Sequence, residues 1–418
     1  MGTTDKLAVI DSPCRYCSAP LRHSFVDLGM SPLCESYVKP DRLDEPEQFY
    51  PLHAYICDRC FLVQLKQYVA PEDIFSDYAY FSSYSDSWVE HARRYSEEMI
   101  ERFGLGRDSL VMEIASNDGY LLQHFVERDV PCLGIEPAAN VARVAIERSI
   151  PTEVSFFGNT VACELARERG KPDLIVGNNV LAHVPELNDF ITGMKTLLKP
   201  GGVITLEFPH LLQLMQHNQF DTIYHEHFSY LSFIFVEQAF AHHGLTLFDV
   251  EELPTHGGSL RIYARHSDDI GLPVSERVGE LHGRELALSL DKLDTYTEFA
   301  QNVCKTKHKL LEFLISAKAA GKSIVGYGAP GKGNTLLNYC GIRTDFLDYT
   351  VDRSPHKQGL FTPGTRIPIE HPDRIFETCP DYVLILPWNL ADEISQQMAA
   401  IRQWGGQFVV PIPEVHIL

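Results

Sequence analysis

The sequence has few of the features that mark membrane, secreted or nucleic-acid-binding proteins. No apolar run reaches the roughly 18 residues that a membrane span needs. The N-terminal stretch has neither a basic start nor a long apolar run, so no secretory signal is expected. Basic residues are scarce: 36 Lys and Arg stand against 56 Asp and Glu, which gives a formal net charge of −20. Because nucleic-acid binding depends on basic surface, we expect no nucleic-acid partner. Because an apolar span and a secretory signal are both missing, we expect no membrane association and a cytoplasmic location.

At 418 residues the chain is too long for one ordinary hydrophobic core, so several domains are expected. Its composition, 44% hydrophobic and 22% charged, is that of a globular protein. The acidic balance still allows a small phosphorylated ligand, because a few backbone N–H groups and one Arg or Lys can bind phosphate. Nothing in the sequence indicates an oligomeric state.

Four of the ten cysteines form two Cys-x-x-Cys pairs, "CRYC" and "CDRC". Two such pairs can place four thiolates at the corners of a tetrahedron, the geometry of closed structural Zn²⁺ sites. Such a site leaves no open position for chemistry, so the metal would hold structure. Two unrelated pairs, or one redox pair, are the alternatives. The expected zinc ligands are Cys14, Cys17, Cys57 and Cys60, and the other six cysteines, including Cys34, are expected to be ordinary thiols.

From residue 108 apolar strand-like runs alternate with amphipathic helical ones, as in "SLVMEIA", "GYLLQHFVERD", "CLGIEP" and "ANVARVAIERS". This alternation predicts a parallel sheet covered by helices, with ligands beyond the carboxyl ends of the strands. The loop "EIASNDG" resembles the first motif of class I S-adenosylmethionine (SAM) methyltransferases, acidic-x-Gly-x-Gly-x-Gly, with Ala115 and Asn117 in two glycine places. Glu136 ends the second strand, where an acid can accept both ribose hydroxyls of adenosine, or equally of NAD.

The later pieces "GNNVLAHVPELNDF" and "LKPGGVITLEFP" are also similar to methyltransferase segments. A tight turn and a solvated strand-end acid would be the simpler explanation of the loop and Glu136. Phe156 and Phe157 are candidates to sandwich adenine, although a buried strand end explains them equally well. Ser83 is a candidate for the methionine carboxylate or a turn former. The expected cofactor contacts are Glu113, Ala115, Ser116, Asn117, Gly119, Glu136, Pro137, Phe156, Asn178, Asn179 and Ser83.

A second glycine-rich loop, "GYGAPGKGN", follows a strand-like run and enters a helix at residues 326–334. It satisfies G-x-G-x-x-G, but Gly333 stands where a P-loop needs Ser or Thr, so a P-loop NTPase is not expected. The N–H groups of such a helix N-terminus can hold a substrate diphosphate as well as a dinucleotide. Arg353, His356 and Lys357 downstream are donors suited to a diphosphate. A structural turn without a ligand is the alternative.

Nearly the whole chain resembles one family, the SAM-dependent sugar C-methyltransferases that make branched deoxysugars. The resemblance rests on the four-cysteine module together with "DLGMSPLCESYV", "DYAYFSSYSDSW", "EIASNDGYLL", "NNVLAHVPEL", "FDTIYHEHFSYLS", "PTHGGSLRIY", "GYGAPGKGNTLLNYCGI" and "VDRSPHKQGLFTPGTRIPI". It implies an α/β protein with a small N-terminal zinc-binding domain (1–85), a central class I methyltransferase Rossmann-like domain (86–285) and a C-terminal Rossmann-like α/β domain (286–418). Residues 287–322 are expected to form one long helix that leads into the last domain.

The resemblance implies SAM as methyl donor, a structural zinc ion and a nucleotide-sugar substrate, a dTDP- or GDP-linked 4-keto-6-deoxy sugar. The methyl would go to the ring carbon next to the keto group, usually C-3. Tyr224 and His227 match the pair implicated in base chemistry, and Glu226 lies between them. Tyr80 and His183 match further active-site positions.

Residue chemistry alone leaves three interpretations of "YHEH" open. A C–H next to a ketone is weakly acidic, so the reaction needs a base such as neutral His227 and a donor to the enolate oxygen, Tyr224 or His183. Glu226 would orient a histidine or contact a sugar hydroxyl. A metal site is the second interpretation, although helical spacing and a third histidine are lacking. Satisfied core groups are the third. His225 departs from the acidic residue of the family and is given no role.

The expected substrate contacts are His256, Arg261, Tyr327, Gly328, Lys332, Asn334, Arg353 and Lys357. Competing functions are an NAD-dependent oxidoreductase that uses the C-terminal glycine loop, an O- or N-methyltransferase acting on a nucleotide sugar, a methyltransferase acting on a macromolecule, and a zinc scaffold without activity. The methyltransferase-like middle segment argues against the first, the lack of a basic stripe against an RNA substrate, and the Tyr/His/Glu cluster against the scaffold.

Overall fold

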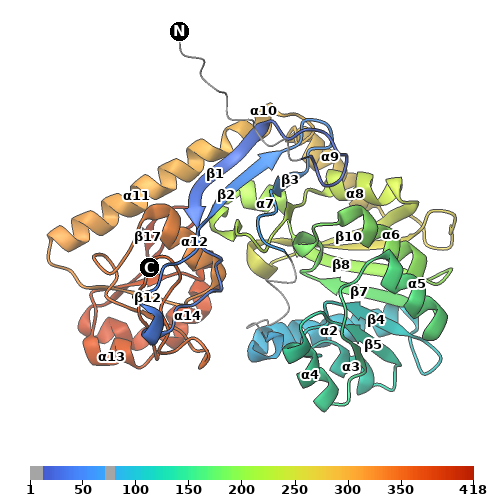
Figure 1. Ribbon diagram of the computed structural model, residues 1–418, viewed down its shortest axis with the longest axis horizontal. Coiled ribbons are helices and arrows are strands. Elements are labelled where there is room, and N and C mark those ends of the chain that lie inside the picture. The colour runs from blue at the N-terminus through green and yellow to red at the C-terminus, as the bar shows by residue number, and fades with distance from the viewer. Residues whose placement is uncertain (1–12, 71–80) are drawn as a thin grey trace, which may run out of the picture.

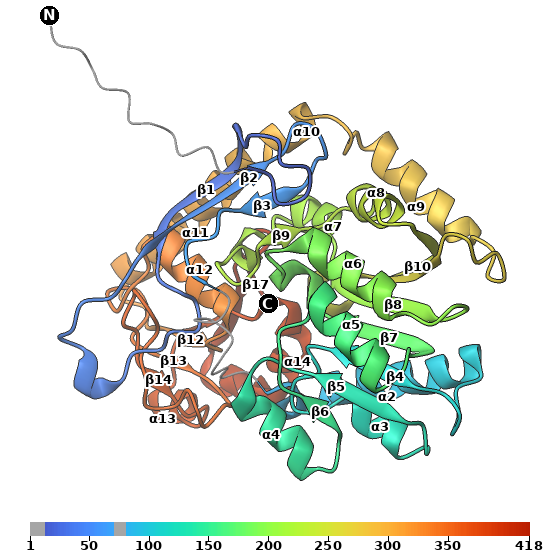
Figure 2. The same ribbon diagram turned by 45° about the vertical axis from the view of Figure 1, so that its right-hand side comes forward.

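The computed structural model describes residues 13–70 and 81–418, which build three sheets (Figure 1). The N-terminal sheet is antiparallel, with the order β1-β2-β3-β9. Three of its strands come from the first part of the chain and the fourth, β9, follows the "YHEH" stretch. Figure 2 shows β3 and β9 side by side above the central part of the molecule. The strands are β1 (His23–Ser31), β2 (Tyr50–Ile56), β3 (Val63–Leu65) and β9 (Ser229–Tyr230).

The central sheet has seven strands in the order β10-β11-β8-β7-β4-β5-β6. Only β11 runs against its neighbours, so the predicted parallel sheet is confirmed. Its middle strands are buried along their whole length, as expected for a sheet covered on both faces. The strands are β4 (Val111–Ile114), β5 (Cys132–Ile135), β6 (Thr152–Glu153), β7 (Leu174–Asn178), β8 (Val203–Pro209), β10 (Leu245–Leu253) and β11 (Ser259–His266).

The helices of the central part flank this sheet (Figure 1). Helix α2 shows the local logic well, because the Ser85 side chain caps its first turn through Trp88 N and Gly104 ends it in a left-handed conformation. The helices are α2 (Asp86–Phe103), α3 (Leu122–Val126), α4 (Ala139–Glu147), α5 (Asn159–Glu168), α6 (Leu187–Leu197), α7 (Leu211–Gln216), α8 (Phe233–His242) and α9 (Glu276–Ala287).

The C-terminal sheet has the order β14-β13-β12-β15-β16-β17, with only β17 antiparallel. The chain moves to one side of β12 with β13 and to the other side with β15, so β12 is the switch point at which ligands bind in open α/β sheets. The elements are β12 (Ile324–Tyr327), β13 (Thr350–Val351), β14 (Ile369–Glu370), β15 (Tyr382–Ile385), β16 (Gln407–Val410), β17 (His416–Ile417), α12 (Gly331–Cys340), α13 (Arg374–Thr378) and α14 (Ala391–Gln397).

The single long helix predicted over residues 287–322 is wrong. The segment instead ends α9, forms the short α10 (Asp294–Thr297) and then the long α11 (Phe299–Ala319). The break falls at Ser289, whose φ is +59° and whose carbonyl accepts a hydrogen bond from Thr295. Serine, aspartate and threonine side chains compete for backbone groups, which favours such turns over continued helix. Within residues 13–70 and 81–418, α11 and every other helix is too short or too polar to cross a membrane.

Candidate active site

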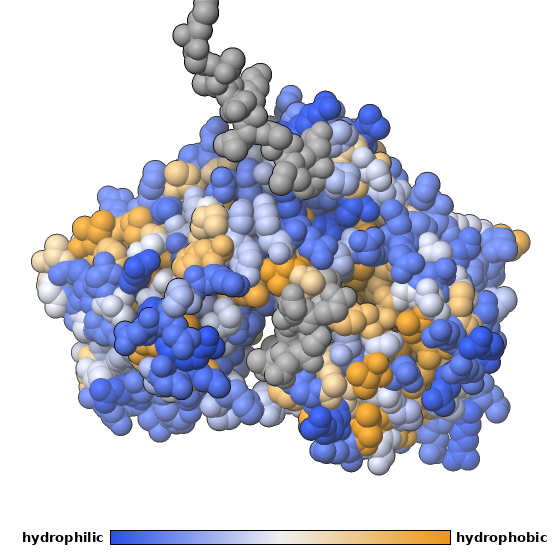
Figure 3. Space-filling view, viewed as in Figure 1, coloured by the Kyte–Doolittle hydropathy of each residue, from blue (hydrophilic) through white to orange (hydrophobic). Residues whose placement is uncertain are grey.

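One cavity of about 1520 Å³ lies where the three sheets meet. It is lined by residues of the N-terminal part, of the carboxyl ends of the central strands, and of the loops after β12, β13 and β15. The face in Figure 3 is hollowed between the C-terminal domain and the central domain. A cavity of this size can hold two ligands of nucleotide size side by side.

The loop after β4 explains why the glycine motif can lose two glycines. Ala115, Asn117 and Gly119 occupy its three glycine places, and all three have positive φ, +57°, +51° and +79°. Asn is among the residues that tolerate this region, and Ala is the smallest residue with a Cβ. A Cβ at Gly119 would lie 2.4 Å from Ile150 Cδ1 and 3.2 Å from Ala145 Cβ, so a side chain there would require its neighbours to shift. The loop therefore keeps the backbone that a cofactor needs to approach closely.

Glu136 lies at the end of β5 beside this loop and lines the cavity. Its carboxylate accepts hydrogen bonds from the backbone N–H groups of Asn117 and Ala138, both at 2.9 Å, which fixes its orientation. Each oxygen keeps a second lone pair for a ribose hydroxyl. Burial raises the pKa of Glu136, although these two bonds oppose the effect. Pro137 lines the cavity next to it.

Three predicted cofactor residues lie beneath the loop and do not line the cavity. Glu113 is fully buried, and burial raises its pKa well above the ordinary value. Ser116 is also fully buried, and its Oγ occupies the space that a Cβ on Gly134 would need. Gly119 packs against Ile150. These residues shape the loop from below, so direct cofactor contact is left to their neighbours.

The segment after residue 80 closes over the same loop. Asn117 Oδ1 accepts from Ser82 N at 2.8 Å, and the Asp118 carboxylate accepts from both the hydroxyl and the N–H of Ser83. Ser83 was expected to meet the methionine carboxylate, but its hydroxyl is bound by Asp118 and the side chain does not line the cavity. Tyr80, the other prediction in this segment, lies outside the described residues.

Phe156 and Phe157 both line the cavity, as the adenine prediction requires. Phe157 packs edge-on against Phe190, at 5.4 Å between ring centroids, while Phe156 keeps 39% of its surface exposed. An exposed aromatic face at the edge of a cavity is a suitable platform for a flat base.

His227 is the centre of the predicted catalytic group. Its ring lies 4.0 Å from that of Tyr224 and 4.7 Å from that of His183, measured between centroids. His227 Nδ1 lies 2.9 Å from the carbonyl oxygen of Thr222, and a carbonyl only accepts, so Nδ1 carries the proton. In the neutral ring Nε2 is then the basic atom. All three side chains line the cavity.

The charge state of these histidines follows from their surroundings. Burial, the neighbouring His183 and the nearby Lys332 lower the pKa of His227 well below its ordinary value. Burial lowers the pKa of His183 to about 4. Both rings are therefore neutral at neutral pH, the form in which His227 can accept a proton.

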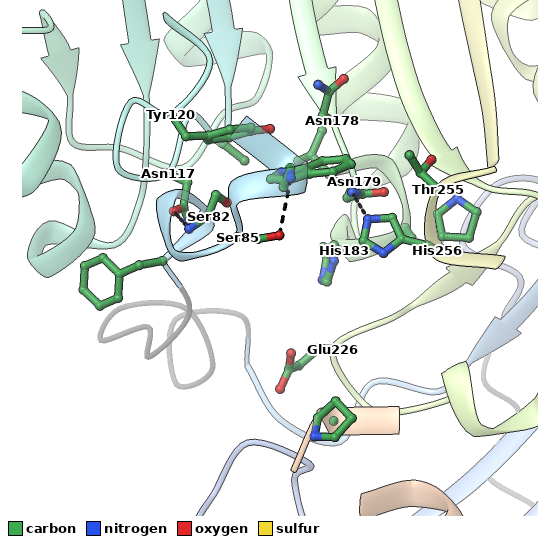
Figure 4. A pocket seen from close by; sticks show the side chains of 18 of the residues that line it. Ser82, Ser85, Asn117, Tyr120, Asn178, Asn179, His183, Glu226, Thr255 and His256 are labelled. Atoms are coloured by element: carbon green, nitrogen blue, oxygen red, sulfur yellow. Dashed lines mark hydrogen bonds between the residues drawn. The ribbon is translucent and has the colours of Figure 1, made fainter. Parts of the chain in front are cut away.

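Glu226 reaches the cavity from the opposite wall, facing His183 and His256 in Figure 4. Burial and the charge of Glu35 raise the pKa of Glu226 to about 8, so the carboxyl group is a hydrogen-bond donor at neutral pH. Its Oε1 lies 3.5 Å from the buried thiol of Cys34, one of the cysteines that sequence reasoning treated as ordinary. His225 lies between the cavity residues Tyr224 and Glu226, but its side chain points away from the cavity and its Nε2 donates to Pro51 O at 3.2 Å. This divergence is incompatible with a metal site on "YHEH".

Asn178 and Asn179 line the cavity at the end of β7. Asn179 Nδ2 lies 2.9 Å from His256 Nε2, and this contact is drawn in Figure 4. His256 is held at φ +54°, which is unusual for a residue with a side chain. Backbone strain of this kind persists only where the surroundings impose it, and here it aims the His256 ring into the cavity.

Sequence reasoning missed a buried network behind His256. Trp88 lines the cavity and stacks on His91 at 4.9 Å between centroids. His91 Nε2 donates to Glu207 at 2.9 Å, and the Glu207 side chain is fully buried. Trp88 and Glu207 lie within the quoted stretches "DYAYFSSYSDSW" and "LKPGGVITLEFP", but neither was given a role, because nothing in the residue pattern shows that the fold joins them.

Arg261 belongs to this network and not to the cavity lining. It is 4% exposed and its guanidinium pairs with Glu207 and Glu251, each at 3.2 Å. It also lies over the ring of Tyr95. Arg261 does not reach the cavity as the predicted substrate contact requires, because its guanidinium is paired with the buried Glu207 and the partly exposed Glu251.

The glycine loop after β12 delivers several predicted residues to the cavity. Tyr327, Gly328 and Lys332 line it from this loop, and Arg353 and Lys357 line it from the segment after β13. Lys332 Nζ donates to Asn389 at 2.7 Å and lies over the Trp388 ring, and burial lowers its pKa. Asn334 does not reach the cavity, because it is fully buried and donates to Cys34 O at 2.7 Å. The loop thus offers Lys332 and the N-terminus of α12 to an anion, and the segment after β13 adds Arg353 and Lys357.

The four predicted zinc ligands come together in the N-terminal part. The sulfurs of Cys14, Cys17, Cys57 and Cys60 all lie within 4.8 Å of one another, with pairs at 3.5 and 3.6 Å. Tetrahedral Zn²⁺ with bonds of about 2.3 Å requires sulfurs about 3.8 Å apart. Four thiolates at this spacing fit zinc, and no position is left open for a substrate.

Comparison with known proteins gives matches along the whole chain. A zinc-binding domain model matches residues 14–75, a methyltransferase domain model residues 88–250, and a C-methyltransferase C-terminal domain model residues 254–413. The C-methyltransferase NovU of Streptomyces niveus is 35% identical over 405 residues, which cover 97% of this chain and 96% of NovU. A ubiquinone biosynthesis O-methyltransferase of Acinetobacter baylyi is 31% identical over 96 residues, 22% of this chain and 40% of that protein. A solved SAM-dependent methyltransferase of Anabaena variabilis aligns with a TM-score of 0.36 and 14% identity, over 43% of this chain and 86% of that one.

Proposed function

The chain belongs to the C-methyltransferase family, and from this premise we propose that it methylates C-3 of a nucleotide-linked 4-keto-6-deoxy sugar. It is a SAM-dependent methyltransferase whose central domain has the class I fold, preceded by a zinc-binding domain. The observation that carries the proposal is the His227 ring, whose basic Nε2 is defined by the Nδ1–Thr222 hydrogen bond and which faces the cavity beside Tyr224 and His183.

SAM supplies an electrophilic methyl group. A ring C–H next to a ketone transfers its proton to His227 Nε2, and the electron pair moves onto the ketone oxygen as an enolate. The Tyr224 hydroxyl or the His183 ring donates to that oxygen, and Glu226, protonated at neutral pH, is a further donor on the opposite wall. The enolate carbon would then take the methyl group as the methyl–sulfur bond breaks, which would restore the ketone and leave S-adenosylhomocysteine. Low histidine pKa values keep the base neutral for each cycle.

The C-terminal loop supports a nucleotide-sugar substrate. Lys332, Arg353 and Lys357 and the N-terminus of α12 line the part of the cavity beyond β12 and β13. A diphosphate placed there would be neutralised by cations and backbone N–H groups, while the sugar reached His227. The cofactor loop after β4 faces the same cavity, which supports one shared reaction site.

The test is hydrogen exchange without methyl transfer. The protein is incubated in D₂O with a dTDP-linked 4-keto-6-deoxy sugar and S-adenosylhomocysteine, and loss of the C-3 proton is followed by NMR. The parent is expected to exchange it, and His227→Asn to lose on the order of 100-fold or more in rate, the contribution of a positioned general base. Mass and NMR analysis of the product with SAM then locates the methyl group on carbon, oxygen or nitrogen.

His225→Asn is the matched control, because it removes the same ring two residues away from a side chain that points out of the cavity. It is expected to exchange at the parent's rate. Both variants should keep the parent's affinity for S-adenosylhomocysteine, which shows that they fold. If His227→Asn exchanges as fast as the parent, His227 is not the base; if the parent neither exchanges nor methylates on carbon, the proposed substrate is wrong.

A further inference from the structure

Arg15 lies between the first two zinc ligands, Cys14 and Cys17, and its side chain runs out of the zinc module. Its Nη1 donates to Pro185 O at 2.9 Å and its Nη2 donates to Leu65 O at 2.6 Å. The guanidinium carbon also lies 5.3 Å from the centre of the Phe228 ring. One cation therefore contacts three separate segments of the chain.

Two of these segments carry the side chains of the proposed chemistry. Pro185 follows His183 by two residues, and Phe228 directly follows His227. The third contact, Leu65, belongs to β3, and its N–H donates to Phe228 O at 3.0 Å as β3 pairs with β9. Arg15 thus joins the loop of His183 to the strand that continues from His227.

The zinc module holds the backbone of Arg15. Gln64 Nε2 donates to the sulfur of Cys14 at 3.1 Å, and Gln64 Oε1 accepts from Arg15 N at 2.9 Å. Asn188 Nδ2 donates to Tyr16 O at 2.9 Å, which ties the residue after Arg15 to α6. A displaced Cys14 would move Gln64 and Arg15 with it.

We propose that Arg15 is a positioning residue that sets the separation of His183 and His227, and that the four-cysteine site holds Arg15 for this purpose. The inference rests on the proposed function for its catalytic consequence. Both histidines act on one substrate carbonyl and its neighbouring carbon, and their rings are 4.7 Å apart. A misplacement of about 1 Å in such a pair costs on the order of 100-fold in rate.

Arg15→Met tests this, because methionine keeps an unbranched chain to pack on Phe228 but has no donor for Pro185 or Leu65. The matched control is Arg22→Met, which removes an exposed arginine of the same module. Arg15→Met is expected to slow C-3 exchange on the order of 100-fold with little change in KM, while one zinc ion per chain and the affinity for S-adenosylhomocysteine are retained. Arg22→Met is expected to match the parent.

Arg15→Lys keeps the charge but replaces the two separate donor nitrogens of the guanidinium with one, so its exchange rate should lie between those of the parent and Arg15→Met. If Arg15→Met loses its zinc, Arg15→Lys decides: exchange at the parent's rate overturns the inference. An independent reading is the ¹H–¹⁵N spectrum of the histidine rings without substrate, in which Arg15→Met should shift the signals of His183 and His227 and Arg22→Met should not. Unchanged His183 and His227 signals in Arg15→Met overturn the positioning role, whether or not the parent exchanges the sugar proton. Failure of the parent to exchange the sugar proton refutes the proposed function and leaves the positioning role to be judged from the spectrum.

Discussion

His256 makes the protein's stability depend on pH in a calculable way. The half-buried His256 ring lines the cavity, and burial and the nearby charge of Lys332 lower its pKa to about 4, against an ordinary 6.5. His91 and His183 add to this effect and Glu207 opposes it. Because the folded pKa is depressed, the neutral ring's contribution is fully present above about pH 6.5 and is lost as the pH falls toward about 4.

The size of the effect follows from these two pKa values. Lowering the pH from about 7.5 to about 5 costs the folded state about 2 kcal/mol through His256 alone, because the unfolded chain binds this proton much more readily. Buried acids such as Glu226, whose pKa is raised to about 8, instead stabilise the folded state as the pH falls. The pH dependence of the parent's stability therefore does not by itself report on His256. The informative quantity is the difference between the parent and a variant that lacks only this ring.

His256→Asn is the variant to make, because Asn tolerates the left-handed backbone that His256 adopts. Urea denaturation followed by tryptophan fluorescence would give the free energy of unfolding of both proteins at each pH. The stability advantage of the parent over the variant should shrink by about 2 kcal/mol between pH 7.5 and 5. His217→Asn, at an exposed histidine, should show no such change. A His256→Asn difference that is constant with pH would refute the claim that the fold keeps this ring neutral.

Two further predictions concern the cofactor and the metal. Glu136→Gln removes the charge that would accept two ribose hydroxyls, so calorimetry should show about 10- to 100-fold weaker binding of S-adenosylhomocysteine. The control Glu153→Gln, on the exposed end of β6, should bind S-adenosylhomocysteine as the parent does. Equal affinities of Glu136→Gln and the parent would place the ribose elsewhere. Cys60→Ser should purify with markedly less than the one zinc ion per chain expected for the parent, and its melting temperature should be lower. The control Cys163→Ser, at an exposed thiol, should keep the parent's zinc content and melting temperature. Full zinc content in Cys60→Ser would contradict the four-thiolate site.

Features written in local patterns were predictable from the sequence. The buried strands β4, β5, β7 and β8 stand out as short apolar runs, and the spacing of Cys14, Cys17, Cys57 and Cys60 predicted the cluster that their sulfurs form. The loop with Ala115 and Asn117 was recognisable because the backbone it needs tolerates only a few residue types. In each case neighbours in the sequence decide the structure.

Roles decided by distant partners were not predictable in the same way. Ser83 has a hydroxyl that could bind a ligand, but Asp118 accepts a hydrogen bond from it. Arg261 has the charge of a phosphate contact, but two acids from other strands neutralise it. Asn334 sits in a glycine loop suited to ligands, yet Cys34 O takes its donor. A buried polar group needs a hydrogen-bond partner, and only the fold decides whether that partner is protein or ligand.

The boundary between the zinc domain and the central domain illustrates why chemistry of this kind depends on the assembled protein. The stretch Tyr224–His227 belongs by chain order to the central part, but Ser229 and Tyr230 pair with β3 as the fourth strand of the N-terminal sheet. His227 is therefore anchored at one end by Thr222 and at the other by a sheet that the zinc module begins. As the proposed base, His227 keeps its tautomer and its distance to His183 only while both domains are in place. A zinc ion in the four-cysteine site, which has no open coordination position, would therefore affect the proposed reaction only through the fold that it holds.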